Sequence, residues 1–421
     1  MKEKLKRIKW LRKIVRAFKA LWYKVKRPFD SAISRFYIKK NNHNRGIKNS
    51  DKIRIGFIAQ IAWSWDKLER VYAAAKDRED VESFLFVVPE DNFDTYELIP
   101  DYTDNYFVEK YPESIKLLNE KGECLDLVDY NLDYLFYQRP FDYRLPEAVS
   151  SKRMVKHLMC CYLPYGFTAS DAFNYNNLKN DFFDNQYFLF MDSPYMKNLF
   201  IKKYHYSYSR KIKRIEYLGY PGLEKYLEMG EKNLTTGYIT WTPRWSFDEH
   251  QGGSTFLKYK DNFIEFAETC GKSFFFRPHP LIHAEIIRHN IMTEDEWVKY
   301  LSDLEKKDVL IDIESPIDGI LEKTEILITD FSTIIGSFFM TGRPIIYCEN
   351  GIEFNPVYQE MKDYMYVAHT WDEVQKYTNE LLAGRDVLKS ERLQFIEDTY
   401  KSSKGSGYRI IERICEDAKR K

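Results

Sequence analysis

The chain of 421 residues carries no net charge, because 64 lysine and arginine residues balance 64 aspartate and glutamate residues. This balance argues against a protein whose whole surface binds nucleic acid, since such surfaces carry an excess of positive charge. The sequence also lacks an HExxH-like pattern and an acidic metal-binding cluster. We therefore predict no metal site built by the protein and no nucleic-acid partner.

Cysteine is scarce and unpatterned. The six cysteines stand at positions 124, 160, 161, 270, 348 and 415, and they show no metal-ligand spacing. The adjacent residues Cys160 and Cys161 cannot form an unstrained disulfide with each other. We therefore expect reduced thiols, as in the cytosol.

The N-terminus lacks the ~20 uninterrupted apolar residues of a membrane span and the apolar core of a signal peptide. Residues 1–27 instead carry twelve lysine or arginine residues against the single acid Glu3. Trp10 and Trp22 add side chains that favour a membrane interface. The apolar residues that recur at helical spacing are Leu5, Ile8, Leu11, Val15, Phe18, Trp22 and Val25. This pattern predicts a basic amphipathic helix.

The favoured interpretation places this helix on the anionic cytoplasmic leaflet of the cell membrane, as a peripheral attachment. A basic helix packed on its own protein or on a partner is the main alternative, and RNA binding is a weaker one. Pro28 is expected to end the helix, and residues 39–50 are expected to form a polar linker.

The stretch of residues 325–348, EILITDFSTIIGSFFMTGRPIIYC, organises the rest of the chain. Its short β-branched run predicts a buried strand, the hydroxyl-rich turn after it predicts a helix start, and a second buried strand follows Gly342. A helix N-terminus beside hydroxyl groups suits a phosphate or diphosphate. A capped helix in any α/β protein would give the same pattern.

Two further motifs precede this one. TPRW occupies residues 242–245, and FFFRPHP occupies residues 274–280. Together with ITDFST and GRPIIYC, they resemble the Pro-Thr-Trp-Arg, Arg-x-His-Pro and TDYSS…KPIIFY motifs of the CDP-glycerol glycerophosphotransferase family, although the arginine and tryptophan of the first motif are transposed. The resemblance is most specific over residues 235–350 and weaker over residues 50–230. It implies an α/β chain of the GT-B fold, in which two Rossmann-like domains face each other across a cleft.

The length of the chain also favours two domains with appendages, because it exceeds that of one ordinary core. We expect residues 1–50 to form the basic helix and linker, and residues 51–232 to form an N-terminal acceptor domain. Residues 233–400 are the expected nucleotide-donor domain, and residues 401–421 the C-terminal helix. That last helix is expected to return to the first domain.

The resemblance places the donor site in the second domain. Arg244 follows a predicted strand, where a guanidinium offers two parallel donors to a diphosphate. His279, fixed between two prolines, is the expected catalytic residue and would donate a hydrogen bond or proton as CMP leaves, with a structural histidine as the alternative. The expected diphosphate-binding residues are Arg244, Arg277, Thr329, Asp330, Ser332 and Thr333.

The expected acceptor side lies after strands of the first domain, because ligands gather at the carboxyl ends of parallel strands. Trp65, Arg139, Tyr165 and Gly166 are its candidates. The family usually has a His-Gly pair where this chain has Tyr165-Gly166, and that histidine is the proposed general base. Tyrosine is a poor base at its ordinary pKa, so the base stays unassigned. A second departure is Ser337, which stands near a family aspartate.

These residues lead to one preferred function and two alternatives. The preferred function is a membrane-peripheral transferase that moves glycerol phosphate, or a related polyol phosphate, from a CDP-activated donor to a polymer or lipid-linked acceptor. CDP-glycerol is then a substrate, and no cofactor is expected. The alternatives are a GT-B glycosyltransferase or epimerase-like enzyme that uses another nucleotide sugar, and a catalytically silent member of a polymer-synthesis complex.

Overall fold

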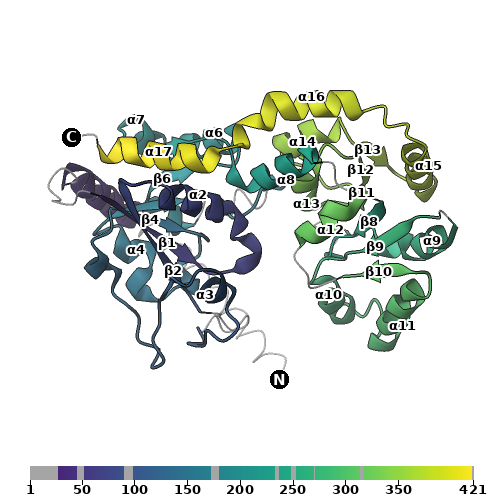
Figure 1. Cartoon of the computed structure of the whole chain (residues 1–421), viewed down its shortest axis with the longest axis horizontal. Helices are drawn as coiled ribbons and strands as arrows, with labels where there is room; N and C mark the ends of the chain where they lie inside the picture. Colours follow the sequence, from purple (N-terminus) through teal and green to yellow (C-terminus); the bar gives the residue numbers. More distant parts are fainter. Residues whose placement is uncertain are drawn as a thin grey trace, which may run out of the picture. The chain divides into compact units, whose positions relative to one another are not determined.

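The computed structural model describes residues 27–44, 52–89, 98–171, 180–232, 237–247, 253–269, 271–312 and 317–419. The chain divides into two compact units (Figure 1). The first unit comprises Met1–Tyr165, Tyr175–Tyr217 and Gly407–Lys421, and the second comprises Gly166–Asn174 and Leu218–Ser406. The predicted amphipathic helix at the N-terminus lies outside the described residues, except for Arg27.

The first unit is built around a parallel sheet whose described strands follow the order β3-β2-β1-β4-β5-β6-β7. The strands are β1 (Ile53–Ala59), β2 (Val81–Val87), β3 (Ile115–Lys116), β4 (Tyr134–Tyr137), β5 (Met159–Tyr162), β6 (Gln186–Phe190) and β7 (Arg214–Glu216). All residues of β4, β5 and β6 are buried. Such continuous burial is typical of a parallel sheet that is covered on both faces.

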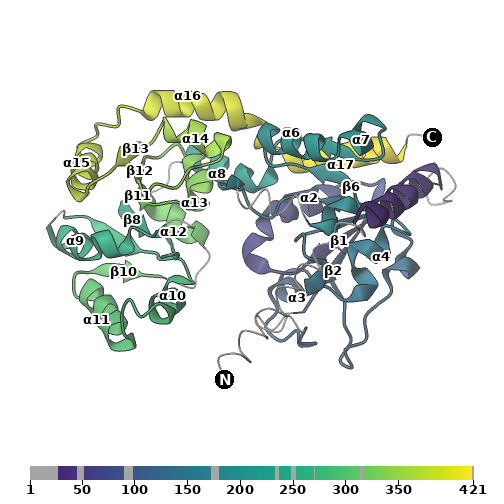
Figure 2. The same cartoon turned by 180° about the vertical axis from the view of Figure 1, so that it is seen from behind.

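Short helices connect these strands. The α-helices are α2 (Asp66–Lys76), α3 (Tyr106–Lys110), α4 (Ser151–Met154), α6 (Pro194–Lys203) and α7 (His205–Ser209). The 3₁₀ helices are η2 (Ala62–Ser64), η3 (Leu127–Tyr130), η4 (Asp142–Arg144), η5 (Glu147–Val149) and η6 (Asp181–Asp184). A further helix covers residues 27–44 and, in the view of Figure 2, crosses the front of this unit.

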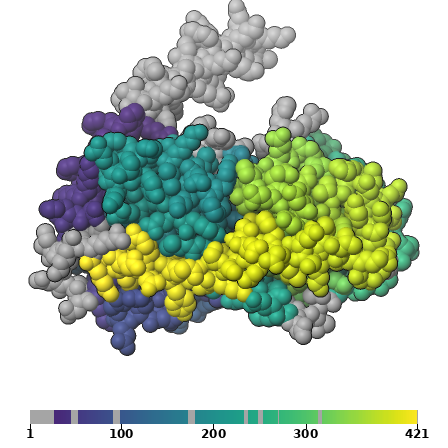
Figure 3. Space-filling model, turned by 90° about the horizontal axis from the view of Figure 1, so that it is seen from above, coloured from purple at the N-terminus to yellow at the C-terminus, as the bar shows by residue number. Residues whose placement is uncertain are grey.

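The C-terminal helix α17 (Ser406–Ala418) packs on the first unit, as expected from the sequence (Figure 3). Its buried Asp417 accepts hydrogen bonds from the hydroxyls of Tyr134 and Tyr187, at 3.0 and 2.9 Å. A Cβ atom at Gly407 would meet the carbonyl oxygen of Arg70 at 2.5 Å, so glycine permits the close approach of α17 to α2.

The second unit contains another parallel sheet, with its described strands in the order β10-β9-β8-β11-β12-β13. These strands are β8 (Tyr238–Thr242), β9 (Ser273–Phe276), β10 (Val309–Ile311), β11 (Thr324–Thr329), β12 (Ile345–Cys348) and β13 (Tyr366–Ala368). The helices are α8 (Pro221–Glu231), α9 (Phe256–Thr269), α10 (Ile282–Arg288), α11 (Glu294–Glu305), α12 (Ile317–Lys323), α13 (Ile334–Phe339), α14 (Pro356–Lys362), α15 (Trp371–Leu382), α16 (Lys389–Tyr400) and η7 (Lys401–Ser403). Aromatic side chains dominate its core, where Trp241 packs against Phe256, Phe263 and Phe276.

One expectation about the chain's connections is wrong, and another is not tested. Pro28 lies in the helical stretch of residues 27–44, and the N-terminal helix that it was expected to end lies outside the described residues. The helical stretch extends through residues 39–44, which were expected to belong to a linker.

The division between the units also differs from the expected boundary at residues 232 and 233. Helix α8 lies in the second unit, where Tyr226 donates a hydrogen bond to Asp318 at 2.8 Å and Lys225 pairs with the same carboxylate at 2.7 Å. A Cβ atom at Gly230 would meet the carbonyl oxygen of Thr341 at 2.8 Å. These contacts join α8 to α12 and to the segment after α13.

Candidate functional site

The candidate donor site lies at the carboxyl ends of three neighbouring strands of the second unit. Strands β9, β8 and β11 are adjacent and parallel, so the segments that follow them meet at one edge of the sheet. Arg244 follows β8, the residues from Arg277 to His279 follow β9, and the turn from Asp330 to Thr333 follows β11. The fold therefore brings the three motifs of the sequence to one place.

The buried side chain of Asp330 connects the segments at this edge of the sheet by hydrogen bonds. Its buried carboxylate accepts hydrogen bonds from the backbone N–H of Arg244 at 2.7 Å and from both the N–H and the hydroxyl of Thr255 at 2.9 Å. Burial raises the pKa of this carboxyl group to about 6, against the opposing effect of these hydrogen bonds. Asp330 thus fixes the backbone of Arg244 and the start of α9.

Thr329 is buried as well, and its hydroxyl joins β11 to β8. It accepts a hydrogen bond from the hydroxyl of Thr242 at 2.8 Å and lies 3.0 Å from the carbonyl oxygen of the same residue. Both Thr329 and Asp330 are fully buried, and their side chains are hydrogen-bonded within the protein. We therefore revise the expectation for these two residues from diphosphate ligands to positioning residues.

Three basic side chains gather above this buried layer. The guanidinium of Arg244 lies over the ring of Phe331 at 5.0 Å and donates to its carbonyl oxygen at 3.1 Å. Arg277 pairs with Asp312 at 2.8 Å. Burial lowers the pKa of both arginines, and the two positive charges also act on His279. Two guanidinium groups and an imidazole ring therefore lie at this end of the sheet, with Asp330 close to Arg244 and Asp312 paired with Arg277.

His279 is held in a defined protonation state. The residue is exposed at the surface, but desolvation of its ring by neighbouring atoms, and then the charges of Arg244 and Arg277, lower its pKa to about 4. Its Nδ1 atom accepts the backbone N–H of Leu281 at 3.2 Å. The neutral ring consequently carries its proton on Nε2, and its centroid lies 6.0 Å from that of Trp245.

Ser332 and Thr333 are the accessible part of the turn after β11. Ser332 is half-buried and accepts the N–H of Ile334 at 3.3 Å, whereas Thr333 is exposed and makes no side-chain cap on α13. Helix α13 has only six residues, so its dipole is weaker than that of a long helix. Two hydroxyl groups therefore remain for an anionic ligand beside the basic cluster.

The first unit contains a second polar region, a cavity of about 280 Å³ at the carboxyl ends of β1, β2 and β4. Its lining includes Arg139, Arg144 and Trp63, and the indole of Trp63 is 72% exposed. Arg144 was missed from the sequence, although a second arginine five residues after Arg139 was a usable signal. An opening with two guanidinium groups suits an anionic ligand.

Trp65, an expected acceptor residue, belongs instead to the core. It is fully buried, its indole N–H donates to the hydroxyl of Tyr111 at 3.0 Å, and its ring packs edge-on against Phe107. Trp63 takes the exposed position because it belongs to η2, before the helix α2 turns Trp65 inward.

The chain leaves the first unit after Tyr165 and enters the second unit at Gly166. The ring of Tyr165 lies 6.4 Å from that of Trp63 and 6.0 Å from that of Phe141, which Arg139 covers at 5.2 Å. Burial raises the pKa of the Tyr165 hydroxyl, while Arg139 opposes that shift. Tyr165 is therefore protonated at neutral pH and lies near the cavity's aromatic rim.

Two units that each fold around a parallel sheet define the chain as a GT-B-like protein of the α/β class. The solved structure of UDP-GlcNAc 2-epimerase from Neisseria meningitidis is similar at 11% identity and a TM-score of 0.59, over 86% of this chain and 100% of that chain. Two structures of the wall teichoic acid polymerase TagF are similar at 13% and 14% identity, with TM-scores of 0.50 and 0.52, over 94% of this chain and 98% of each of those chains. At these identities the likeness establishes the fold.

The sequence profile of CDP-Glycerol:Poly(glycerophosphate) glycerophosphotransferase matches residues 156–382, more than half of the chain. The protein belongs to this family and is an enzyme of the glycerophosphotransferase type. No match was found among curated protein sequences. The matched range contains the whole basic cluster described above.

The described residues lack two features that would bear on function. No helix in that part of the chain is long and apolar enough to cross a membrane. The same residues contain no group of three or more histidine, cysteine, aspartate or glutamate side chains that could hold a metal ion.

Proposed function

We propose that this enzyme transfers glycerol phosphate, or a related polyol phosphate, from a CDP-activated donor to a hydroxyl group of a cell-surface polymer or a lipid-linked acceptor. The acceptor oxygen attacks the β-phosphorus, the bond from that phosphorus to the bridging oxygen breaks, and CMP leaves with the bonding electrons. The observation that carries this proposal is the cluster of Arg244, Arg277 and His279 within the range that the family profile matches.

The donor diphosphate would lie against this cluster. Arg244 and Arg277 would neutralise the charge that develops on the phosphate oxygens, and the Nε2–H of His279 would donate a hydrogen bond to the leaving CMP. Ser332 and Thr333 would donate further hydrogen bonds to the diphosphate. Asp330 would act indirectly, because it fixes the backbone of Arg244.

The acceptor would occupy the cavity of the first unit. A growing polyol-phosphate chain is itself anionic, and Arg139 and Arg144 offer two guanidinium groups to its phosphates. Tyr165 and Gly166 would lie beside this chain. Because its pKa is raised, Tyr165 would donate a hydrogen bond rather than remove the acceptor's proton. A loose phosphoryl-transfer transition state reduces the need for a strong base.

The enzyme would work on the cytoplasmic face of the cell membrane. The support is the sequence of residues 1–27, with twelve basic residues, regular apolar positions and two tryptophans. A peripheral attachment of this kind suits an acceptor that is anchored to a lipid.

Release of CMP from CDP-glycerol tests the proposal, with membrane extract as the source of acceptor. We expect His279→Ala to lower the rate by about 10²–10³-fold, the effect of removing one donor to a developing charge. His289→Ala is the matched control, because His289 lies at the end of α10, exposed and paired with Glu285. Equal rates for wild type and His279→Ala would remove His279 from the mechanism.

The same assay separates the alternatives. Binding and turnover of UDP-GlcNAc, without binding of CDP-glycerol, would favour an enzyme that acts on another nucleotide sugar. The fold likeness to UDP-GlcNAc 2-epimerases makes this the first competing donor to test. Binding of CDP-glycerol without CMP release, over a range of acceptors, would favour a silent member of a synthesis complex.

A further inference from the structure

The helix of residues 27–44 turns a mainly polar face toward the protein, in which Ile38, at 1% exposed, is the buried apolar residue. Ser34 is buried and donates a hydrogen bond to the side-chain oxygen of Asn185 at 2.7 Å. Asn41 donates to the carbonyl oxygens of Val155 and Leu158, at 2.9 and 3.1 Å. These contacts attach the helix firmly to the first unit through polar groups.

The outer face of the same helix is apolar over residues 28–36, whereas the exposed residues among 39–44 are polar. Phe29, Ile33 and Phe36 follow a spacing of four and three residues, so they lie on one side of the helix, and they are 69%, 38% and 62% exposed. Ala32, between them on the same side, is also exposed. A helix on a water-exposed surface normally shows the opposite arrangement, so this apolar stripe indicates a surface with a partner.

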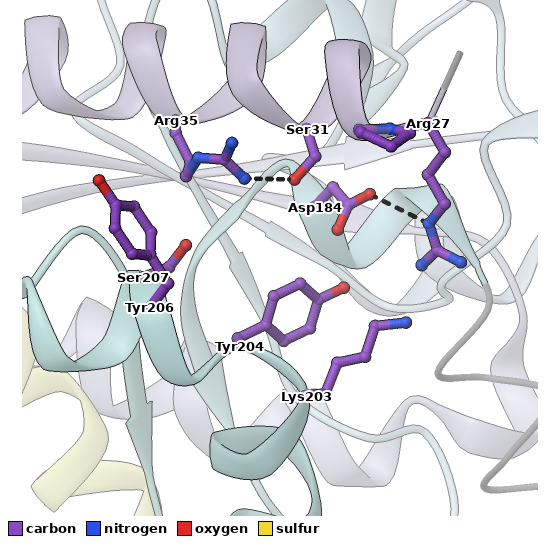
Figure 4. A pocket seen from close by; sticks show the side chains of 9 residues that line it. Arg27, Ser31, Arg35, Asp184, Lys203, Tyr204, Tyr206 and Ser207 are labelled. Atoms are coloured by element: carbon purple, nitrogen blue, oxygen red, sulfur yellow. Dashed lines mark hydrogen bonds and ion pairs between the residues drawn. The ribbon is translucent and has the colours of Figure 1, made fainter. Parts of the chain in front are cut away.

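A basic pocket lies beside the helix (Figure 4). It has a volume of about 450 Å³ and lies between the helix, η6 and the segment α6–α7. Arg27, Arg35 and Lys203 line it, whereas Asp184, paired with Arg27 at 3.6 Å, is the acidic group in its lining. Burial and then the charge of Arg27 lower the pKa of Lys203, against the opposing charges of Asp184 and Asp181, and Arg27 also pairs with Asp181 at 3.4 Å.

Exposed aromatic rings border the pocket on its other side. Tyr206 is 57% exposed, and the guanidinium groups of Arg35 and Arg210 lie over its ring at 5.8 and 5.6 Å. Tyr208 is also exposed. Apolar, aromatic and cationic side chains in close succession are the combination that favours the interface of an anionic bilayer.

We propose that the apolar stripe and the basic pocket form the surface by which the protein binds an anionic membrane. Phe29, Ile33 and Phe36 enter the interfacial layer, and Arg35 and Lys203 bind lipid phosphates. This proposal deepens the membrane attachment in the proposed function, and it assigns that attachment to residues beyond the basic N-terminal segment.

The positive charge beside the stripe favours an anionic lipid surface over two other possible occupants, a second copy of the chain and the N-terminal segment. A second copy of the chain, related by two-fold symmetry, would bring the same cationic pocket toward its own equivalent. Residues 1–26, folded back over the stripe, would add eleven basic residues to an already basic region. An anionic bilayer is complementary both to the stripe and to the charges beside it.

Vesicle flotation of the full-length protein tests this surface. We expect binding to vesicles of phosphatidylcholine that contain phosphatidylglycerol, and little binding to phosphatidylcholine alone. The Phe29→Ser/Phe36→Ser variant should bind the anionic vesicles at least ~10-fold more weakly, because it removes two large apolar anchors. Leu257→Ser/Val298→Ser is the matched control, since these apolar residues are also exposed, at 43% and 58%, on helices of the second unit.

A variant that removes positive charges tests the same surface independently in the vesicle-flotation experiment. Arg35→Gln/Lys203→Gln should weaken binding by roughly 30-fold, at ~1 kcal/mol for each basic residue near the surface. Lys306→Gln/Lys401→Gln, which removes two exposed charges of the second unit, should leave binding unchanged. If the double phenylalanine variant melts below the wild type, the single change Ile33→Ser replaces it.

Unchanged vesicle binding in both the apolar and the charge variants would overturn the proposal, as would absence of binding by the wild type. A wild-type dimer that the phenylalanine variant converts to a monomer would assign the stripe to a second copy, and so overturn it as well. CMP release with a water-soluble glycerol-phosphate oligomer should be equal in the wild type and these variants. If neither the wild type nor the variants released CMP with this soluble acceptor, that result would contradict the proposed function and would leave the proposed membrane surface unaffected.

Discussion

At the scale of the residue, the protonation state of His279 decides what it contributes. Its Nδ1 atom accepts the N–H of Leu281, so the ring is suited to the neutral form with a proton on Nε2. The depressed pKa of about 4 has the same consequence, because it keeps the ring neutral at physiological pH in the free enzyme. His279 therefore acts as a hydrogen-bond donor, while the permanent positive charge comes from Arg244 and Arg277.

This state predicts the pH dependence of kcat/KM, which reports the ionisations of the free enzyme. The contribution of His279 should be constant above about pH 5 and should fall only as the pH approaches 4, where a protonated Nδ1 would oppose the N–H of Leu281. The measurement is kcat/KM for CDP-glycerol between pH 4 and 8. An inflection near the ordinary histidine value of 6.5, present in the wild type and absent in His279→Ala, would contradict this assignment.

The same shift makes the stability of the protein fall in acid, in the same direction as the contribution of His279 to activity. The folded-state pKa lies below that of the unfolded chain, so between pH 6.5 and 4 the unfolded state binds the proton more readily. The neutral ring's contribution to stability is therefore present above pH 6.5 and is lost as the pH falls toward 4.

At the scale of the element, α13 is packed tightly around Gly336. A Cβ atom there would meet the hydroxyl of Tyr358 at 2.4 Å and the ring of Phe167 at 2.5 Å. The Tyr358 hydroxyl donates to the carbonyl oxygen of Phe167 at 3.0 Å and lies 3.3 Å from that of Thr333, so it has little freedom to withdraw. The turn that carries Thr333 thus depends on a glycine beside it.

Gly336→Ala should consequently lower the free energy of unfolding. Overpacking costs about 1–3 kcal/mol, which exceeds the gain of up to about 1 kcal/mol from replacing a helical glycine. Gly319→Ala in α12 is the control, because a Cβ atom there meets nothing within 4 Å, and it should be neutral or stabilising. Urea unfolding of both variants measures the difference. Equal stability of the two variants would show that α13 can shift to accept the methyl group.

A comparison of the predicted and observed helices and strands shows which elements could be predicted from the sequence. The apolar runs at residues 53–59 and 134–137 predict strands that coincide with β1 and β4, and residues 371–382 predict a helix that coincides with α15. The runs at 238–241, 326–328 and 345–347 predict β8, β11 and β12 within two residues of their ends. Strands of two or three residues such as β3 and β10 were missed, because so short a segment has no period to detect.

The site could be located from the sequence more easily than the direction of its side chains. The motifs placed Arg244, Arg277 and His279 after the correct strands. They did not reveal that Asp330 turns inward or that Trp65 belongs to the core, because burial depends on neighbours that are distant in sequence, such as Thr255 and Tyr111. The cavity around Arg144 was missed for the same reason.

At the scale of the whole molecule, the first unit is assembled from segments far apart in the chain, whereas the second is nearly continuous in sequence. Helix α17 closes the first unit through Asp417, which is buried between Tyr134, Tyr187 and Arg413. The last residues of the chain are thus needed by a sheet whose first strand begins at Ile53.

This arrangement predicts that damage to α17 is confined to one unit. Asp417→Ala removes a buried, hydrogen-bonded charge and should destabilise the first unit by about 3–5 kcal/mol. Amide hydrogen exchange, followed by mass spectrometry, should accelerate in peptides from β1 to β7 and stay unchanged in peptides from β8 to β13. Asp398→Ala, an exposed change on α16, is the control and should accelerate neither group. Equal acceleration in both sheets would contradict this prediction, because it would mean that the two units unfold together. The Asp417→Ala change would then also unfold the segments of the second unit that carry the donor cluster.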